Sequence, residues 1–243
     1  MDELYTKSWL EFYDKYCPEK SYEMSATEAI SIIKTYNIDS KRLLELACGT
    51  GRYTRYLVRA GFLVMATDIS KDAIEHAKQK GINATFDAID MRDIDFHGGY
   101  DVVACFYESF RYMKSYSDCK HTLKQINLAL NPKGLFLCDF SHFPESRGTM
   151  SLPLHDVDMG DGLVIRQETT LFTDGDFDER RDKMTFMRNG VVEKVQNVKR
   201  NPLLRISEDH MREMLENAGF KIIEMRRGFI SNDESILYIA KKL

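Results

Sequence analysis

Five apolar runs of strand length alternate with helical segments, and this alternation is the feature that most restricts the fold. The helical segments between the runs end at glycines or at an Asn-Pro turn. Alternation of this kind predicts a parallel, doubly wound sheet, in which ligands bind beyond the carboxyl ends of the strands. We therefore predict an α/β, Rossmann-like core. The runs are RLLELA, FLVMATDIS, NATFDAID, YDVVACFY and LFLCDFS.

The pattern changes between residues 149 and 206, where no long helix is visible. GLVIRQETTLF, DKMTFMR and VVEKVQNVK look extended, and they are separated by TDGDFDERR and by Asn189-Gly190, a strong signal for a two-residue hairpin. This segment predicts an antiparallel β insertion. A helix capped by Ser207 and two strands, KIIEMRRGFI and SILYIAKKL, follow it. We expect residues 1–148 to form N-terminal helices and the ligand-binding core, 149–206 a cap, and 207–243 the last helix and strands of the core.

The predicted insertion carries apolar side chains that need a partner face, because a three-stranded sheet alone would leave one face exposed. We expect the insertion to roof the binding pocket beyond the carboxyl ends of the strands and to form part of a homodimer contact. An opening helix carries an aromatic stripe, which either packs on the core or lets Tyr13 and Tyr16 close over the ligand as an N-terminal cap. The stripe comprises Trp9, Phe12, Tyr13 and Tyr16. The apolar side chains are Leu163, Ile165, Met184, Phe186, Val195 and Val198.

Composition excludes several classes of function. The formal net charge is −4, whereas a nucleic-acid binder usually has an excess of basic residues. The N-terminal segment has no basic region followed by an apolar one, and no run approaches the roughly 20 apolar residues of a membrane span. We therefore predict a cytoplasmic protein. Five scattered cysteines predict reduced thiols, with neither disulfides nor a zinc site.

The stretch LLELACGTGRYTRYL predicts a strand, a glycine turn and a helix, a layout that often binds nucleotides. An NAD site would need a third glycine, but Thr54 occupies that position. Glu45 would place negative charge near a pyrophosphate, and no Gly-Lys-Ser/Thr of a phosphate-binding loop follows. The ligand should instead lack phosphate, offer a carboxylate to the loop N–H groups and offer a cation to Glu45.

Asp68 adds a further requirement to the ligand. It follows the glycines by about 20 residues, the position from which a carboxylate accepts bonds from ribose hydroxyls. S-adenosylmethionine (SAM) meets every condition, since it has an amino-acid end, a sulfonium and a ribose but no phosphate.

Four ordered motifs, LLELACGTGRYT, VMATDIS, DAIDMRDIDF and YDVVACFYESFRYM, resemble those of class I SAM-dependent methyltransferases. The resemblance covers most of the chain and implies a seven-stranded core. The insertion resembles that of small-molecule enzymes, including sugar N,N-dimethyltransferases and the glycine N-methyltransferase group.

The resemblance implies a set of cofactor contacts. Glu45 would hold the amino end of SAM or, alternatively, serve as a structural acid. Asp68 would bind the ribose, while Asp90 and Met91 would bind the adenine or form only a solvated loop. The full set is Tyr13, Tyr16, Tyr22, Glu45, Ala47, Cys48, Gly49, Thr50, Gly51, Asp68, Ile69, Asp90, Met91, Cys105 and Phe106.

The segment CFYESFRYM should line the methyl-transfer centre. Similar sugar N-methyltransferases have a histidine near its end, where this chain has Tyr112, which is either catalytic or core. Tyr107 and His142 are the other catalytic candidates, and His142 is the best-placed histidine base. A metal site is not expected, because Asp139 has no partner acid before Glu108.

The sequence thus predicts transfer of a methyl group from SAM to an amine or hydroxyl of a small molecule, with S-adenosylhomocysteine (SAH) as product. An RNA or protein methyltransferase, or a SAM-binding regulator without activity, is the alternative.

Overall fold

The computed structural model describes residues 7–16, 19–36, 41–141, 148–229 and 235–243. The chain divides into two compact units. One comprises Met1–Pro18 and Pro144–Arg205, and the other Glu19–Phe143 and Ile206–Leu243. The opening helix therefore groups with the insertion, whereas the sequence had suggested that it joins the core.

The larger unit contains a seven-stranded sheet in the order β12-β13-β5-β4-β1-β2-β3. The five strands from β1 to β5 run parallel, and β13 is antiparallel to both β5 and β12. All five predicted apolar runs and both predicted C-terminal strands are present. The strands are β1 (Arg42–Leu46), β2 (Leu63–Asp68), β3 (Thr85–Ala88), β4 (Tyr100–Cys105), β5 (Leu130–Ser141), β12 (Phe220–Arg227) and β13 (Ser235–Lys242).

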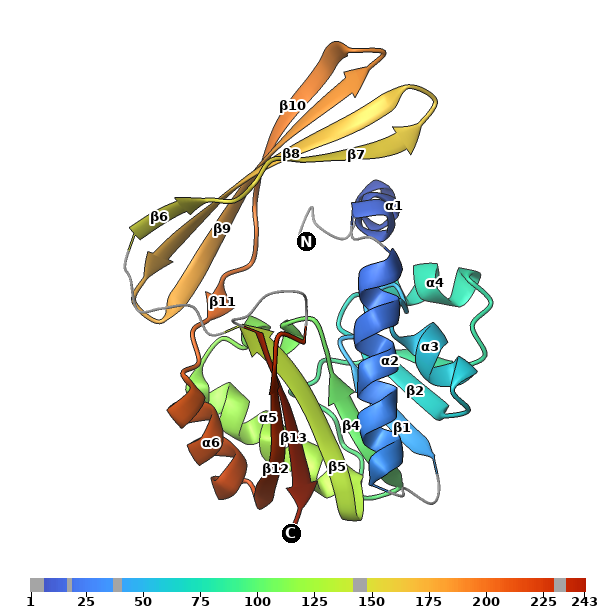
Figure 1. The fold of residues 1–243 in the computed structure, drawn as a ribbon, viewed down its shortest axis with the longest axis vertical. Coiled ribbons are helices and arrows are strands. Elements are labelled where there is room, and N and C mark those ends of the chain that lie inside the picture. The colour runs from blue at the N-terminus through green and yellow to red at the C-terminus, as the bar shows by residue number, and fades with distance from the viewer. Residues whose placement is uncertain (1–6, 17–18, 37–40, 142–147, 230–234) are drawn as a thin grey trace. The chain divides into compact units, whose positions relative to one another are not determined.

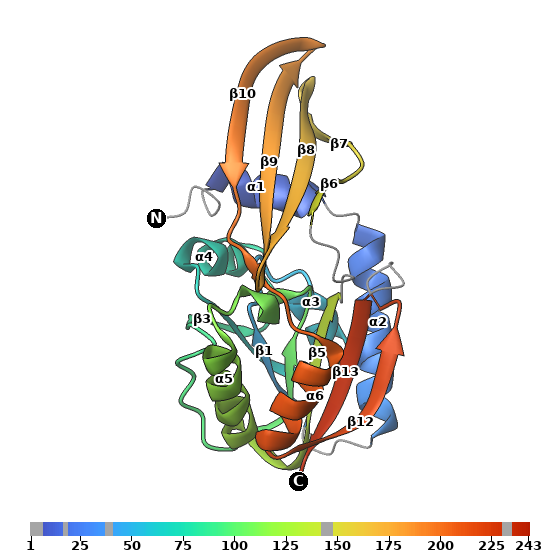
Figure 2. The same ribbon diagram turned by 90° about the vertical axis from the view of Figure 1, so that its left-hand side faces the viewer.

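Helices cover both faces of this sheet. Figures 1 and 2 show α5 and α6 together on one face, and α2 and α3 on the other. The strands between them are accordingly buried on both sides, and Leu43, Val102 and Phe136 are fully enclosed. The helices are α2 (Glu19–Thr35), α3 (Thr54–Arg59), α4 (Lys71–Gln79), α5 (Tyr116–Ala129) and α6 (Glu208–Asn217), with a short 3₁₀ helix η2 (Ser109–Tyr112).

Serine side chains begin three of these helices. Ser70, Ser115 and Ser207 each accept a hydrogen bond from the backbone N–H three residues later, at 3.1 Å. Each cap satisfies one of the N–H groups that a helix start leaves without an intrahelical partner. The predicted cap at Ser207 is confirmed.

The smaller unit contains a six-stranded antiparallel sheet in which β10, β9, β8 and β6 follow one another, while β7 pairs with β8 and β11 with β9. The sequence predicted only three strands here. It treated TDGDFDERR as a connection, but β8 and β9 run into this segment and turn at Gly175, whose φ is +57°. The strands are β6 (Gly148–Ser151), β7 (His155–Gly160), β8 (Leu163–Asp174), β9 (Phe177–Arg188), β10 (Val191–Lys199) and β11 (Leu203–Leu204).

The hairpin at Asn189-Gly190 is confirmed. It joins β9 to β10, and both residues have positive φ, +48° and +80°. Positive φ at both central residues is what a type I′ hairpin turn requires, and asparagine and glycine adopt it most readily.

The apolar face of this sheet is covered by α1 (Lys7–Tyr16). Phe12 is the centre of the contact, with Trp9 and Tyr16 packed around it. Arg200 lies 3.9 Å over the Trp9 ring, and Lys15 donates to the carbonyl of Met159 at 2.6 Å. The insertion therefore finds its partner face within its own unit, so the packing argument for a homodimer is removed. The buried strand residues are Val157, Ile165, Met184 and Val198.

We expect Phe12→Ala to destabilise this unit by about 3–5 kcal/mol, because it leaves a cavity in the apolar core. Val195→Ala is the matched control, since the Val195 side chain is 50% exposed in the same sheet. Urea unfolding followed by the fluorescence of Trp9, the single tryptophan, measures both. Equal effects of the two substitutions would contradict the packing of α1 on the sheet.

Candidate active site

The sheet has its switch point between β1 and β4. Strand order proceeds in one direction through β2 and β3 and in the other through β5. The segments that follow β1 and β4 therefore diverge, and ligands in such folds bind beyond this point. The predicted glycine loop follows β1, and the predicted methyl-transfer segment follows β4.

The glycine loop is shaped by left-handed backbone. Ala47, Gly49 and Gly51 have φ of +52°, +54° and +76°. A Cβ at Gly51 would lie 3.1 Å from the Ile82 side chain, whereas one at Gly49 would meet nothing within 4 Å. The positive φ of Gly51 and the nearby Ile82 side chain both disfavour a larger residue there, and the space beside Gly49 is open.

Asp68 joins the loop to the end of β2. Its carboxylate accepts the N–H of Gly49 through Oδ2 and the N–H of Ser70 through Oδ1, both at 2.8 Å. The side chain is almost fully buried, and this burial raises its pKa, while the two N–H groups lower it. Each oxygen keeps a lone pair for a ribose hydroxyl. Ile69, beside it, is 61% exposed and can pack on a base.

Glu45 is buried within β1. Burial raises its pKa to about 8, and the charge of Asp68 adds to this, while a hydrogen bond from Thr54 Oγ1 at 2.6 Å opposes it. Thr54, which stands at the position of the missing third glycine, thus anchors the acid. The Glu45 carboxyl therefore has a structural hydrogen bond, and its role toward the amino end of SAM stays a prediction.

The remaining predicted adenine contacts lie after β3. The Asp90 carboxylate accepts from the backbone N–H of Arg92 at 3.0 Å and also forms an ion pair with its guanidinium, which lowers the pKa of Asp90. Met91 is partly exposed beside it. Asp90 therefore has an internal partner that competes with an adenine amine.

Tyr22 is a buried member of an aromatic cluster. Its ring stacks on Tyr107, with centroids 5.0 Å apart, and Arg52 lies 3.9 Å over the ring. Tyr53 packs edge-on against Tyr22 at 5.1 Å and stacks on Phe106 at 4.7 Å. The cluster brings the glycine-loop side of the sheet into contact with the segment after β4.

Other predicted contacts are distributed differently. Tyr13 and Tyr16 lie on α1, in the smaller unit, where the Tyr16 ring packs 4.8 Å from His155. Cys48 and Cys105 are buried at the ends of β1 and β4, and burial raises the pKa of the Cys48 thiol.

The three catalytic candidates differ in what the structure says of them. Tyr107 begins the turn after β4 and contacts Tyr22. Tyr112 ends η2 with 48% of its surface exposed, so it is not a core residue. His142 falls outside the described residues.

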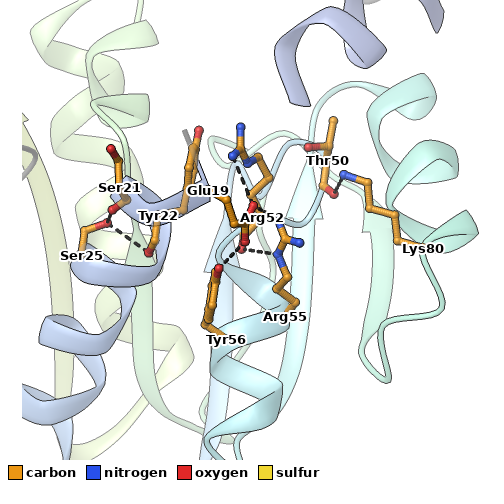
Figure 3. A network of polar contacts seen from close by, with 9 residues as sticks. All are labelled: Glu19, Ser21, Tyr22, Ser25, Thr50, Arg52, Arg55, Tyr56 and Lys80. Atoms are coloured by element: carbon orange, nitrogen blue, oxygen red, sulfur yellow. Dashed lines mark hydrogen bonds and ion pairs between the residues drawn. The ribbon is translucent and has the colours of Figure 1, made fainter. Parts of the chain in front are cut away.

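A polar network joins α2 to α3 and holds the glycine loop, and the sequence analysis did not predict it (Figure 3). Glu19, at the start of α2, accepts from Arg52 at 3.4 Å, from Arg55 at 2.8 Å and from the Tyr56 hydroxyl. Lys80 donates to the carbonyl of Thr50 at 2.8 Å. No local pattern identifies these partners, because they come from separate elements.

Comparison with known proteins places these features in a family. Residues 43–134 match the family described as "Methyltransferase domain". The chain is 27% identical to YqeM of Bacillus subtilis (strain 168), which is named as a methyltransferase, over 80% of this chain and 79% of that protein. The protein is a class I SAM-dependent methyltransferase.

Two further comparisons concern enzymes that act on amino sugars. The chain is 24% identical to the dTDP-3-amino-3,6-dideoxy-alpha-D-glucopyranose N,N-dimethyltransferase of Streptomyces fradiae, over 60% of this chain and 58% of that one. Its fold matches SAM-bound CalS10, an amino pentose methyltransferase from Micromonospora echinaspora, with a TM-score of 0.83 and 16% identity over 100% of both chains.

SAM is the cofactor of this methyltransferase, and the residues fit it. The open space at Gly49 leaves room for the cofactor, and the buried acids Glu45 and Asp68 supply an acceptor for an ammonium and an acceptor for a ribose. Within the described residues, no set of His, Cys, Asp and Glu side chains is arranged to hold a metal ion. Nor does any described helix have the length and apolar character to cross a membrane.

We expect Asp68→Asn to weaken SAH binding about tenfold or more, because a hydrogen bond to a charged acceptor contributes about 1.5–3 kcal/mol. Asp87→Asn on neighbouring β3 is the control, since Asp87 is exposed and bonds only the backbone N–H of Ala88 among its recorded hydrogen bonds. Isothermal calorimetry measures both. Unchanged affinity in a folded Asp68→Asn protein would show that Asp68 does not hold the ribose.

SAH binding should also release about one proton at pH 7. Glu45, with a pKa of about 8, is mainly protonated in the free protein, and a bound ammonium would lower that pKa and drive the proton off. Calorimetry in two buffers of different ionisation enthalpy counts the proton. The release should vanish in Glu45→Gln; equal release in both proteins would rule out this role.

Proposed function

We propose that this methyltransferase transfers the SAM methyl group to the amine of a small molecule, with a hydroxyl as the second candidate acceptor. The observation that carries the choice of nitrogen is the similarity to an amino-sugar N,N-dimethyltransferase. The net charge of −4 favours a small acceptor over RNA.

SAM supplies an activated methyl on a sulfonium, open to in-line attack by the lone pair of the acceptor. The residues of the chain have to align the reactants and exclude water. Asp68 and the glycine loop hold the cofactor, and Glu45 meets its amino end. The aromatic cluster of Tyr22, Tyr53 and Tyr107 provides apolar walls next to the sulfonium, a favourable surface for a cation.

A proton must leave the acceptor nitrogen before or after attack. Tyr107 and Tyr112 are the described candidates that orient or deprotonate it, and His142 is the third. A neutral amine needs no strong base, so we propose orientation as the main role of the two tyrosines.

The rest of the proposal concerns setting and assembly. We propose a cytoplasmic enzyme that acts without nucleic acid or membrane. A homodimer through the antiparallel sheet has support only from the exposed side chains of Val191, Val192 and Val195 on β10. Sedimentation velocity decides between monomer and dimer.

Turnover should be detected as SAH release when purified protein and SAM are incubated with candidate acceptors. The panel contains dTDP-3-amino-3,6-dideoxyglucose, glycine, catechol as a hydroxyl acceptor, an unmethylated peptide and bulk tRNA. We expect release with an amine of low molecular mass, and about a fifth of that release or less with Asp68→Asn at SAM concentrations near the wild-type KM. Release with tRNA or peptide alone would favour the macromolecular alternative, and tight SAH binding without any turnover would favour a regulator.

A further inference from the structure

The turn after β4 is held in an unusual backbone conformation. Tyr107 and Glu108 have φ of +61° and +60°, so two consecutive residues with large side chains lie in the left-handed region. Residues other than glycine, asparagine and aspartate rarely adopt this region, because the Cβ atom then approaches the backbone too closely. Neighbouring groups must therefore stabilise the turn, and such strain tends to occur at functional sites.

Asp139 provides this stabilisation from β5. It is fully buried, with its Oδ1 accepting the N–H of Tyr107 at 2.7 Å and its Oδ2 accepting the N–H of Glu108 at 3.2 Å. One carboxyl group thus bonds both strained residues, one oxygen to each. Burial and the charge of Glu108 raise the pKa of Asp139 to about 8, so this acid is enclosed at an electrostatic cost that the two N–H groups reduce.

The outer side of the turn is fixed as well. The Glu108 carboxylate accepts from the buried guanidinium of Arg111 at 3.1 Å and from the hydroxyl of Ser141, two residues beyond Asp139 on β5. On the inner side, the Tyr107 ring stacks on Tyr22 at an interplanar angle of 14°. These contacts hold the turn in one conformation, and that conformation sets the direction of the Tyr107 ring.

We propose that Asp139 is a positioning residue for methyl transfer: it holds the left-handed Tyr107–Glu108 turn and thereby fixes the Tyr107 side chain at the end of β4. This rests on the proposed function in one respect, namely that the segment after β4 lines the methyl-transfer centre. Asp139 itself touches neither cofactor nor acceptor in this scheme.

The test is Asp139→Asn, which keeps the size of the side chain but replaces one accepting oxygen by an NH₂ group that cannot accept. Asp101→Asn is the matched control. Asp101, at the opposite end of β4, also accepts a backbone N–H, that of Arg42 at 3.1 Å, and an amide N–H of Asn131 at 2.9 Å. Both proteins are compared with the wild type for SAH binding, for turnover of whichever panel acceptor is active, and for the ¹³C-tyrosine ring signal of Tyr107, assigned with Tyr107→Phe.

We expect Asp139→Asn to lower kcat about 100-fold, the effect of a misplaced group near the reacting atoms. The Kd for SAH should stay within twofold of the wild-type value, and the Tyr107 signal should shift or broaden. Asp101→Asn should change none of the three. Wild-type kcat with an unmoved Tyr107 signal, or a loss of SAH affinity as large as the loss of kcat, would overturn the proposal.

A second variant tests the strain itself. Glycine adopts a φ near +60° without penalty, but Glu108→Gly alone would remove the carboxylate that pairs with the buried guanidinium of Arg111. Glu108→Gly is therefore combined with Arg111→Met, and the pair should recover at least tenfold of kcat in the Asp139→Asn protein and restore the Tyr107 signal. A combined variant with a lower kcat than Asp139→Asn and an unrestored Tyr107 signal would contradict the proposal, and the combined variant also serves if Asp139→Asn alone does not fold. If no acceptor in the panel is methylated, the proposed function fails, while the Tyr107 signal still decides the role of Asp139.

Discussion

The hydrogen bond from the Gly49 N–H to the Asp68 carboxylate is the interaction on which the cofactor side of this methyltransferase depends. A backbone bond from Cys48 N–H to the carbonyl of Thr67 at 2.9 Å continues the β1–β2 pairing up to the loop. From there Asp68 fixes the chain as it turns away from the sheet. The same carboxylate is the candidate ribose acceptor, so cofactor binding and loop geometry cannot be altered independently at this residue.

Three acids, Glu45, Asp68 and Asp139, are buried near the carboxyl ends of β1, β2 and β5. Each has a raised pKa because burial disfavours its charge. Local hydrogen-bond donors partly offset this rise in pKa: a threonine hydroxyl for Glu45, and backbone N–H groups for Asp68 and Asp139. Such groups are costly to enclose and destabilise the protein unless they are satisfied. Glu45 and Asp68 fit a ligand that brings a cation and hydroxyl donors, whereas Asp139 holds the turn after β4.

Much of the larger unit could be predicted from sequence, because its signals are local. Apolar runs predicted its parallel strands and Ser207 predicted the start of a helix, while in the smaller unit Asn189-Gly190 predicted a hairpin. The short strand β6 was missed since its residues are all exposed and it has no apolar alternation. The contacts of Asp139 with the β4 turn and of Glu19 with Arg55 were also missed, because each joins residues more than 30 positions apart. The sequence alone could not assign roles to individual site residues, because their burial and their hydrogen-bond partners arise only in the folded chain. These roles stay predictions.

The packing of α1 on the antiparallel sheet has a consequence for how the protein folds. The contact between Lys15 and Met159 spans 144 positions along the chain, and the core around Phe12 depends on the same long closure. Closing a loop of this length is slow, whereas the βαβ units of the larger sheet assemble from near neighbours. Until the helix docks, the strands carrying Ile165 and Met184 present an uncovered apolar face, which makes this interval the period when newly made chains are most prone to aggregate.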